Sequence, residues 1–308
     1  MTSNSLPEGF IPVMLTPFLA DGQVDYKGLE LLTDKYIQWG AKGLFANCLS
    51  SEMYELSSQE RLDVVNTVVR TAAGRVPVVA TGTLGGSLEE MADFSKRLWS
   101  MGVSAVIVLN NILTLESESD AVFLDRMHAF MQLTPGIPLG IYECPVPYKR
   151  LITVEILENL LPTGRLVYHK DTSLDIQQVR DRVKAGANDN FGLYDAYMGH
   201  AVLSLQAGAK GLSCIQGNLF PELIVWLCAH ARDASKKVIV DEVQAFFANN
   251  MDPMHAVYPT AAKYVLQKNG FPMDLYTRRE VGTLTAKHKV ELDRLIAEGQ
   301  ALLLKTRQ

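Results

Sequence analysis

Short apolar runs recur along the chain at regular intervals, and each is followed by a stretch whose apolar residues are spaced three or four positions apart. Nearly continuous apolar runs are typical of parallel strands that are covered on both faces. Spacing of three or four positions predicts amphipathic helices. The predicted strands occupy residues 11–16, 43–47, 76–81, 104–109, 137–142, 166–170, 190–194 and 210–215.

Helix-boundary signals fall between these runs, where an alternation of strands and helices requires them. A serine followed three residues later by a glutamate predicts a capped helix start. A glycine directly after an amphipathic stretch supplies the left-handed residue that ends a helix. The boundary residues are Ser57 with Glu60, Ser87 with Glu90, and the glycines Gly40, Gly74 and Gly102.

Strands alternate with helices along most of the chain, and this order predicts one parallel sheet. Eight such units without a long linker favour a closed TIM (β/α)₈ barrel over an open sheet. We expect the barrel to span residues 1–232, ending in a helix over 219–232. Residues 233–308 are expected to add helices over 236–249, 258–268 and 283–304, packed on the barrel as one structural unit.

Composition narrows the possible partners and location of this 308-residue chain, of which 48% is apolar and 20% charged. A net charge of −5 argues against nucleic-acid binding. No run approaches the roughly 18 apolar residues of a membrane span, and residues 1–9 lack the pattern of a secretory signal. Four scattered cysteines without a CxxC pair predict reduced thiols in the cytoplasm. Glycine fingerprints for nucleotides are absent, so we expect no cofactor.

Candidate chemistry lies at the carboxyl ends of the predicted strands, where the active sites of TIM barrels are built. Lys170 ends the sixth run, in Val167-Tyr168-His169-Lys170. Strand alternation predicts that Tyr168 and Lys170 face the barrel axis if Val167 and His169 face the helices. An unpaired lysine in that position favours its neutral form, which is a nucleophile for carbonyl groups.

The fifth run ends at Tyr142, one strand away from Lys170. A tyrosine hydroxyl at this height can transfer protons while an imine forms and a carbon–carbon bond breaks. A lone tyrosine or a lone lysine at a strand end is more often structural or solvated. The pair on adjacent strand ends predicts catalysis by Lys170 and Tyr142.

Several motifs resemble the dihydrodipicolinate synthase / N-acetylneuraminate lyase family, in the order in which that family carries them. Tyr142 and Pro145 form a Y-x-x-P motif, and Lys170-Asp171-Thr172-Ser173 follows it. The other matching motifs are Leu15-Thr16-Pro17-Phe18, Ser50-Ser51-Glu52, and the segment 56–61 with its Leu-Ser-x-x-Glu-Arg pattern. The resemblance extends from about residue 10 to about residue 220 of the barrel.

The resemblance implies a class I lyase, an aldolase or dehydratase in which Lys170 forms a Schiff base with pyruvate or another 2-oxo acid. It implies that Tyr142 relays protons and that Ser50 and Ser51 bind the carboxylate of the substrate. It also implies that Asp195 holds a substrate hydroxyl and that Ser213 and Cys214 line the pocket. Members of the family are commonly tetramers of two dimers, so we expect a homotetramer.

Three departures from the family pattern concern the second substrate. Leu49 replaces a hydroxyl residue that assists the relay tyrosine, and Ile112 replaces a tyrosine that reaches into the partner subunit's site. Pro147 replaces the arginine with which synthases bind the aldehyde's carboxylate, although Lys149 or Arg150 can substitute. These departures favour a 2-oxo-3-deoxy acid or a 4-hydroxy-2-oxo acid over the synthase substrates.

Other functions stay open at the level of the sequence. One is a genuine dihydrodipicolinate synthase, and another is an inactive relative that binds a 2-oxo acid. A metal-dependent aldolase needs His, Asp or Glu ligands that converge from several strand ends. The six histidines fall mostly in predicted helices or tails, so we expect no metal site.

Overall fold

The computed structural model describes residues 5–188 and 190–307. In this part of the chain eight parallel strands form one sheet of order β1-β8-β7-β6-β5-β4-β3-β2. The strands are β1 (Gly9–Phe10), β2 (Leu44–Ala46), β3 (Val78–Thr81), β4 (Ala105–Leu109), β5 (Leu139–Tyr142), β6 (Leu166–Asp171), β7 (Leu193–Asp195) and β8 (Gly211–Leu212). The expectation that residues 1–9 form no secretory signal concerns in part residues 1–4, which lie outside the described part.

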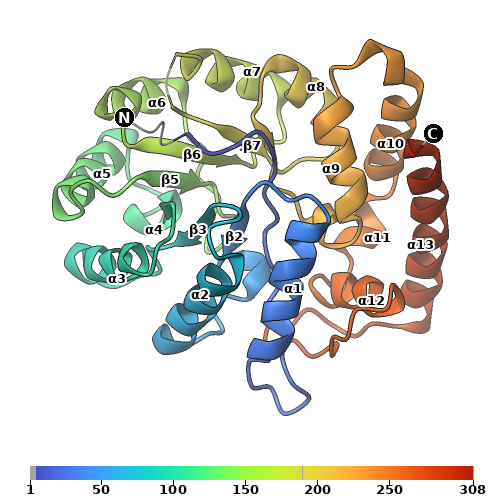
Figure 1. Cartoon of the computed structure of the whole chain (residues 1–308). Helices are drawn as coiled ribbons and strands as arrows, with labels where there is room; N and C mark the ends of the chain where they lie inside the picture. The colour runs from blue at the N-terminus through green and yellow to red at the C-terminus, as the bar shows by residue number, and fades with distance from the viewer. Residues whose placement is uncertain (1–4, 189, 308) are drawn as a thin grey trace.

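A parallel bridge between Val13 and Phe45 closes the sheet, because it joins the segment after β1 to β2. The amide of Met14 donates to the carbonyl of Phe45 (3.0 Å), and the amide of Phe45 donates to the carbonyl of Pro12 (2.9 Å). Figure 1 shows the curled sheet with the helices packed around its outer face. The predicted TIM barrel is confirmed.

The helices around the barrel follow the strands in alternation (Figure 1). They are α1 (Tyr26–Gln38), α2 (Ser58–Ala72), α3 (Leu88–Ser100), α4 (Asn110–Leu113), α5 (Asp120–Leu133), α6 (Val154–Leu160), α7 (Ile176–Ala185), α8 (Ala201–Ala207) and α9 (Pro221–His230). Short 3₁₀ turns are η1 (Leu49–Ser51), η2 (Leu161–Thr163), η3 (Ile215–Asn218) and η4 (Ala234–Lys236). Both predicted capping boxes are confirmed at the starts of α2 and α3. The three predicted glycines after helix ends have positive φ angles.

The remaining helices lie together on one side of the barrel, coloured orange to red in Figure 1. They are α10 (Lys237–Asn249), α11 (Met251–His255), α12 (Thr260–Lys268) and α13 (Ala286–Thr306). The predicted helix over 258–268 starts late, at Thr260, because the ring of Pro259 disfavours the helical conformation for the residue before it, Tyr258. The division of the chain at residue 232 stays a prediction. No helix in residues 5–188 and 190–307 is long and apolar enough to cross a membrane.

Three strand predictions were wrong in their bounds. The first predicted strand, 11–16, begins only where β1 (Gly9–Phe10) has ended, because Pro12 has no N–H with which to continue the ladder and only the bridge at Val13 remains. The eighth, 210–215, ends early because the chain turns into η3. The seventh, 190–194, starts late and runs on to Asp195. The other five agree within two residues.

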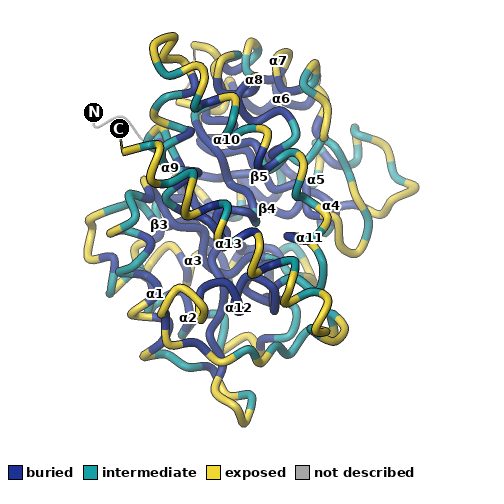
Figure 2. The backbone as a smooth tube through the Cα atoms, turned by 90° about the vertical axis from the view of Figure 1, so that its right-hand side faces the viewer, coloured by how far each residue is buried: buried dark blue, intermediate teal, exposed yellow. Residues whose placement is uncertain are grey.

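Buried residues form two layers, one inside the barrel and one between the strands and the helices, and both appear dark blue in Figure 2. Aromatic rings fill the inner layer. The ring of Tyr168 stacks on that of Tyr194 with centroids 4.8 Å apart, and Phe45 packs edge-on against Tyr168 at 5.9 Å. This packing confirms that Tyr168 faces the barrel axis, and it forms a solid floor below the carboxyl ends of the strands.

Candidate active site

Lys170 lies at the carboxyl end of β6 with only 4% of its surface exposed. Its Nζ lies 4.1 Å from the centre of the Tyr142 ring, and the two residues are partners in the ladder between β5 and β6. No ion pair involves Lys170 within the described ranges 5–188 and 190–307. Burial lowers the pKa of Lys170, while the nearby thiols of Cys48, Cys144 and Cys214 act in the opposite direction. Burial therefore makes the neutral, nucleophilic form of this amine easier to reach than that of an exposed lysine.

Tyr142 is buried beside the lysine at the end of β5. Burial raises the pKa of its hydroxyl well above 10, and the neighbouring Cys144 thiol acts in the same direction. Phe45 packs edge-on against the ring with centroids 5.9 Å apart. The phenol is held in place and stays protonated at neutral pH, so it can donate a proton to a bound molecule.

Ser50 and Ser51 lie in η1, the turn after β2, and both are buried. The hydroxyl of Ser51 donates to the carbonyl of Met14 (2.7 Å) and accepts from the amide of Cys48 (3.1 Å). Ser51 thus holds the turn itself together. Ser50 lies against the hydroxyl of Tyr258, whose hydrogen bond to Ser50 lowers the Tyr258 pKa against a larger rise from burial. Carboxylate binding by this turn stays a prediction.

The other predicted pocket residues lie at the ends of β7 and β8, and all three are fully buried. The Asp195 carboxylate accepts from the amide of Tyr197 (2.8 Å) and lies 3.0 Å from Nε2 of His200. The Ser213 hydroxyl accepts from Tyr168 (2.8 Å) and belongs to the layer below Lys170. Burial raises the pKa of the Cys214 thiol to about 12. Roles for these three residues in substrate binding stay predictions.

The loop after β5 is held by an amide from α4. The side-chain nitrogen of Asn111 donates to the carbonyls of Cys144 (2.7 Å), Val146 (2.9 Å) and Tyr148 (2.5 Å). Arg150 pairs with the carboxylate of Asp120 (2.5 Å). Ile112 lies in the short helix α4, next to Asn111, the residue that supports this loop.

The loop also carries Lys149, whose ammonium donates to the carbonyl of Thr172 just past β6. Of the two cations that could replace an arginine at Pro147, Arg150 is engaged by a carboxylate, and Lys149 remains exposed near the strand end.

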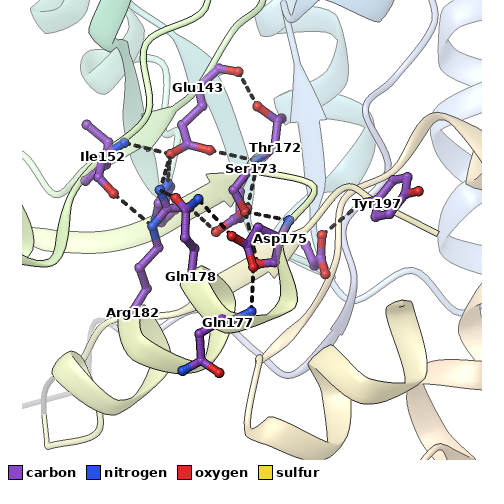
Figure 3. Close-up of polar contacts among 12 residues, drawn as sticks. Glu143, Ile152, Thr172, Ser173, Asp175, Gln177, Gln178, Arg182 and Tyr197 are labelled. Carbon is purple, nitrogen blue, oxygen red and sulfur yellow. Dashed lines mark hydrogen bonds and ion pairs between the residues drawn. The ribbon is translucent and has the colours of Figure 1, made fainter. Parts of the chain in front are cut away.

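Three potential metal ligands, Glu143, His169 and Asp171, lie within 4.8 Å of one another and are buried. The guanidinium of Arg182 on α7 occupies this cluster, because it pairs with Glu143 (3.0 Å) and with Asp171. Both carboxylates are therefore already compensated by a cation. Figure 3 shows Arg182 reaching towards Glu143 and the start of the loop after β6.

Sequence reasoning missed this cluster, although a signal was present. Glu143, His169 and Asp171 alternate with the inward-facing Tyr142 and Lys170, so they face the helices. Charged residues on a covered strand face require a buried partner. That partner was not identifiable from the sequence, because any cation on a neighbouring helix would satisfy the pattern.

Comparison with known proteins agrees with this geometry. The model of the dihydrodipicolinate synthetase family matches residues 6–299. A 4-hydroxy-tetrahydrodipicolinate synthase from Laribacter hongkongensis is 28% identical over 296 residues, covering 95% of each chain. A protein named putative 2-dehydro-3-deoxy-D-gluconate aldolase YagE, from Escherichia coli, is 27% identical over 238 residues, covering 76% of this chain and 77% of the relative.

Solved structures share the fold. The crystal structure of YagE from Escherichia coli, described as a complex with pyruvate, has a TM-score of 0.85 and 22% identity, and covers 95% of this chain and 98% of its own. A dihydrodipicolinate synthase from Acinetobacter baumannii, also described with pyruvate, has a TM-score of 0.84 at 21% identity and covers 96% and 99%. The family match spans nearly the whole chain. The chain belongs to the dihydrodipicolinate synthetase family, and the predicted enzyme class, a Schiff-base-forming lyase, is confirmed for it at the level of that family.

Proposed function

We propose that Lys170 forms the Schiff base and Tyr142 relays the protons in this lyase. The observation that carries the proposal is a buried lysine that has no carboxylate partner in the described part of the chain and lies 4.1 Å from the ring of a buried tyrosine on the adjacent strand. A lysine that is charged in such surroundings lacks compensation, so the neutral amine is favoured.

The chemistry follows from these two groups. The neutral amine of Lys170 attacks the C2 carbonyl of a 2-oxo acid, and loss of water gives an iminium ion. For a 4-hydroxy-2-oxo acid, removal of the hydroxyl proton breaks the C3–C4 bond and releases an aldehyde, and the electron pair moves into an enamine. Tyr142 moves the protons in these steps. Protonation of the enamine and hydrolysis of the imine then release pyruvate and restore the lysine.

We further propose that the substrate is a 2-oxo-3-deoxy acid or a 4-hydroxy-2-oxo acid. A synthase must bind the carboxylate of aspartate semialdehyde, and Pro147 stands where the resemblance expects a cation. Arg150 is already paired with Asp120 at 2.5 Å, which leaves only the exposed Lys149 on this loop. The relative named as a putative 2-dehydro-3-deoxy-D-gluconate aldolase supports a sugar-acid substrate. Condensation with aspartate semialdehyde should be negligible.

A substrate panel tests this assignment. The purified protein is incubated with 2-oxo-3-deoxy sugar acids and 4-hydroxy-2-oxo acids, and released pyruvate is measured, with Lys170→Met as the blank. Turnover of at least one panel member, without condensation of pyruvate and aspartate semialdehyde, supports the assignment. Robust synthase kinetics would overturn it, and Lys149→Ala would then show whether Lys149 is the anchor. Imine formation without any turnover would favour an inactive binding relative.

We also propose that the chain is a cytoplasmic homotetramer built from two dimers, with residues 1–232 and 233–308 as one structural unit. The family resemblance supports the tetramer, and the four cysteines, which are all free, suit a reducing compartment. Sedimentation of the active protein should give a species larger than a monomer. A strictly monomeric active enzyme would contradict this assembly.

A further inference from the structure

Two buried carboxylates stand beside the proposed catalytic residues in the sequence. Glu143 follows Tyr142 at the end of β5, and Asp171 follows Lys170 at the end of β6. Neither carboxylate exposes any surface. Because strand residues alternate, these side chains point away from the barrel axis, towards the helices. A buried charge is costly unless it is paired and hydrogen-bonded, so their partners define what holds the two strand ends.

One guanidinium from α7 joins both carboxylates. Nη2 of Arg182 lies 3.0 Å from a Glu143 carboxylate oxygen, and Nη1 donates to Asp171. Nε donates to the carbonyl of Ile152 at 2.8 Å, and Nη2 also contacts Gln178 at 3.1 Å. The arginine exposes only 1% of its surface. Its planar, charge-assisted bonds fix directions as well as distances.

Glu143 also binds across to the chain beyond β6. Its carboxylate accepts from the amides of Ile152 and Thr172, each at 2.8 Å, and its carbonyl accepts from the Thr172 hydroxyl at 2.8 Å. The Asp171 carboxylate accepts from the amide (2.8 Å) and the hydroxyl (2.7 Å) of Ser173. Figure 3 shows these bonds converging around Arg182 and Glu143. Two strand ends are thereby joined through one network.

We propose that Arg182 is a positioning residue that, through Glu143 and Asp171, fixes Tyr142 and Lys170 relative to each other. The proposal rests on the proposed function of those two residues. Glu143 and Asp171 are each joined by a peptide bond to one of the proposed catalytic residues. A shift of either acidic residue therefore moves the backbone of Tyr142 or Lys170. Proton transfer is sensitive to such shifts, because a displacement of about 1 Å can lower a rate roughly 100-fold.

The same network affects whether Glu143, His169 and Asp171 could bind a metal ion. A divalent cation would have to displace a guanidinium that is already bonded to both carboxylates. The competing explanation is that Arg182 serves stability alone, since buried ion pairs are weak evidence for any single role. The test must therefore separate the geometry of the site from the stability of the fold.

Arg165, at the other end of the same strand, is a matched control. It lies just before β6 and donates to the carbonyls of Ile137 (3.0 Å) and Met131 (2.6 Å), so it ties together the amino-terminal ends of β5 and β6. The variants Arg182→Lys and Arg165→Lys each keep the charge and lose the fork of the guanidinium. Both should lower thermal stability, but only Arg182→Lys should alter the chemistry.

The measurement is exchange of the methyl protons of pyruvate in D₂O, followed by NMR and divided by the number of sites trapped with pyruvate and borohydride. Exchange requires the imine and a proton-transfer group, and it requires no knowledge of the second substrate. Arg182→Lys should retain full trapping and lose roughly 10- to 100-fold in exchange per trapped site. Arg165→Lys should leave exchange per trapped site unchanged.

A double-variant cycle identifies the residue through which Arg182 acts. In a Tyr142→Phe background, Arg182→Lys should change the remaining exchange by less than about twofold, because the proton group it positions is already gone. Equal losses in both backgrounds, or an equal per-site loss from Arg165→Lys, would overturn the proposal. If Arg182→Lys does not fold, Glu143→Gln replaces it in the cycle, with the same expected pattern. Absence of trapping in the unmodified protein would instead reject the proposed function.

Discussion

Two lysines of this barrel are almost completely buried, and they differ in what faces their amino groups. Lys263 on α12 exposes no surface, and its Nζ lies 3.2 Å from the carboxylate of Glu52 and 2.6 Å from the carbonyl of Tyr276. Lys170 faces an aromatic ring and weakly acidic thiols. Both lie over aromatic rings, at 4.7 Å from Phe18 and 4.1 Å from Tyr142.

The difference between the two sites lies in the ion pair. Burial lowers the pKa of both lysines, but at Lys263 the Glu52 carboxylate raises it again by charge and by hydrogen bonding. The pKa of Lys263 stays below that of an exposed lysine, but the ion pair with Glu52 and the hydrogen bond to Tyr276 engage its amino group, so it is not free to attack a carbonyl. Glu52 also accepts from the amides of Arg278 and Arg279, at 2.7 and 2.9 Å. Lys263 therefore docks the C-terminal segment on the turn after β2, whereas Lys170 has no such ion pair among the described residues.

Replacement of Lys170 should produce the largest effect. Lys170→Met removes the amine and keeps an apolar stem, so the protein should fold and lose its chemistry. We expect pyruvate exchange in D₂O to fall by more than about 10⁴, as for other lost nucleophiles. Exchange that persists through Lys263 or any other lysine would break the comparison between the two sites.

Tyr142→Phe tests the role of the phenol hydroxyl, because it gives Lys170 the same kind of aromatic neighbour that Lys263 has in Phe18. The ring packing against Phe45 is retained, so trapping by borohydride should continue. Pyruvate exchange should fall by about 10² to 10⁴, the usual contribution of general acid–base catalysis. An undiminished exchange rate would show that another group carries the proton.

Glu52→Gln tests the other half of the comparison. It leaves Lys263 buried without its carboxylate, and breaking a buried pair typically destabilises a fold by about 3–5 kcal/mol. The free energy of unfolding in urea measures this loss. Glu60→Gln, which removes the more exposed partner of Arg278, is the control and should cost about 1 kcal/mol. Equal losses from the two variants would mean that burial of the Glu52 pair has no special role.

The smallest expected effect is a shift in pH dependence. Because burial lowers the pKa of Lys170, the rate of trapping with pyruvate should rise with pH and level off with a midpoint below 10.5, the value of an exposed lysine. The neutral amine is the reactive form, so the sign of this change is fixed. A midpoint at or above 10.5 would mean that Lys170 is not desolvated in solution.

Local patterns were sufficient to predict much of this fold. Alternation in the sixth strand placed Tyr168 and Lys170 on the inward face, and contacts with Tyr194 and Tyr142 confirm that placement. The capping boxes at Ser57 and Ser87 are local as well. The first strand was misplaced, because Pro12 interrupts the ladder within an otherwise apolar run.

Partners that lie far apart in the sequence could not be predicted. Glu52 appeared in a recognised motif, but Lys263, its partner, comes 211 residues later. Glu143 and Arg182 likewise lie on different segments, the end of β5 and α7, and the position of α7 beside the strand ends brings them to 3.0 Å. A buried carboxylate needs a compensating cation, and only the fold determines which cation reaches it.

We propose that Lys170, rather than any other lysine, forms the imine, and one experiment tests this directly. The direct measurement is to incubate the protein with pyruvate and borohydride, digest it, and locate the added pyruvyl group by peptide mass spectrometry. We expect one reduced pyruvyl group per chain on the peptide that contains Lys170, with Lys263 unmodified. Modification of another lysine, or no modification by any 2-oxo acid, would contradict it.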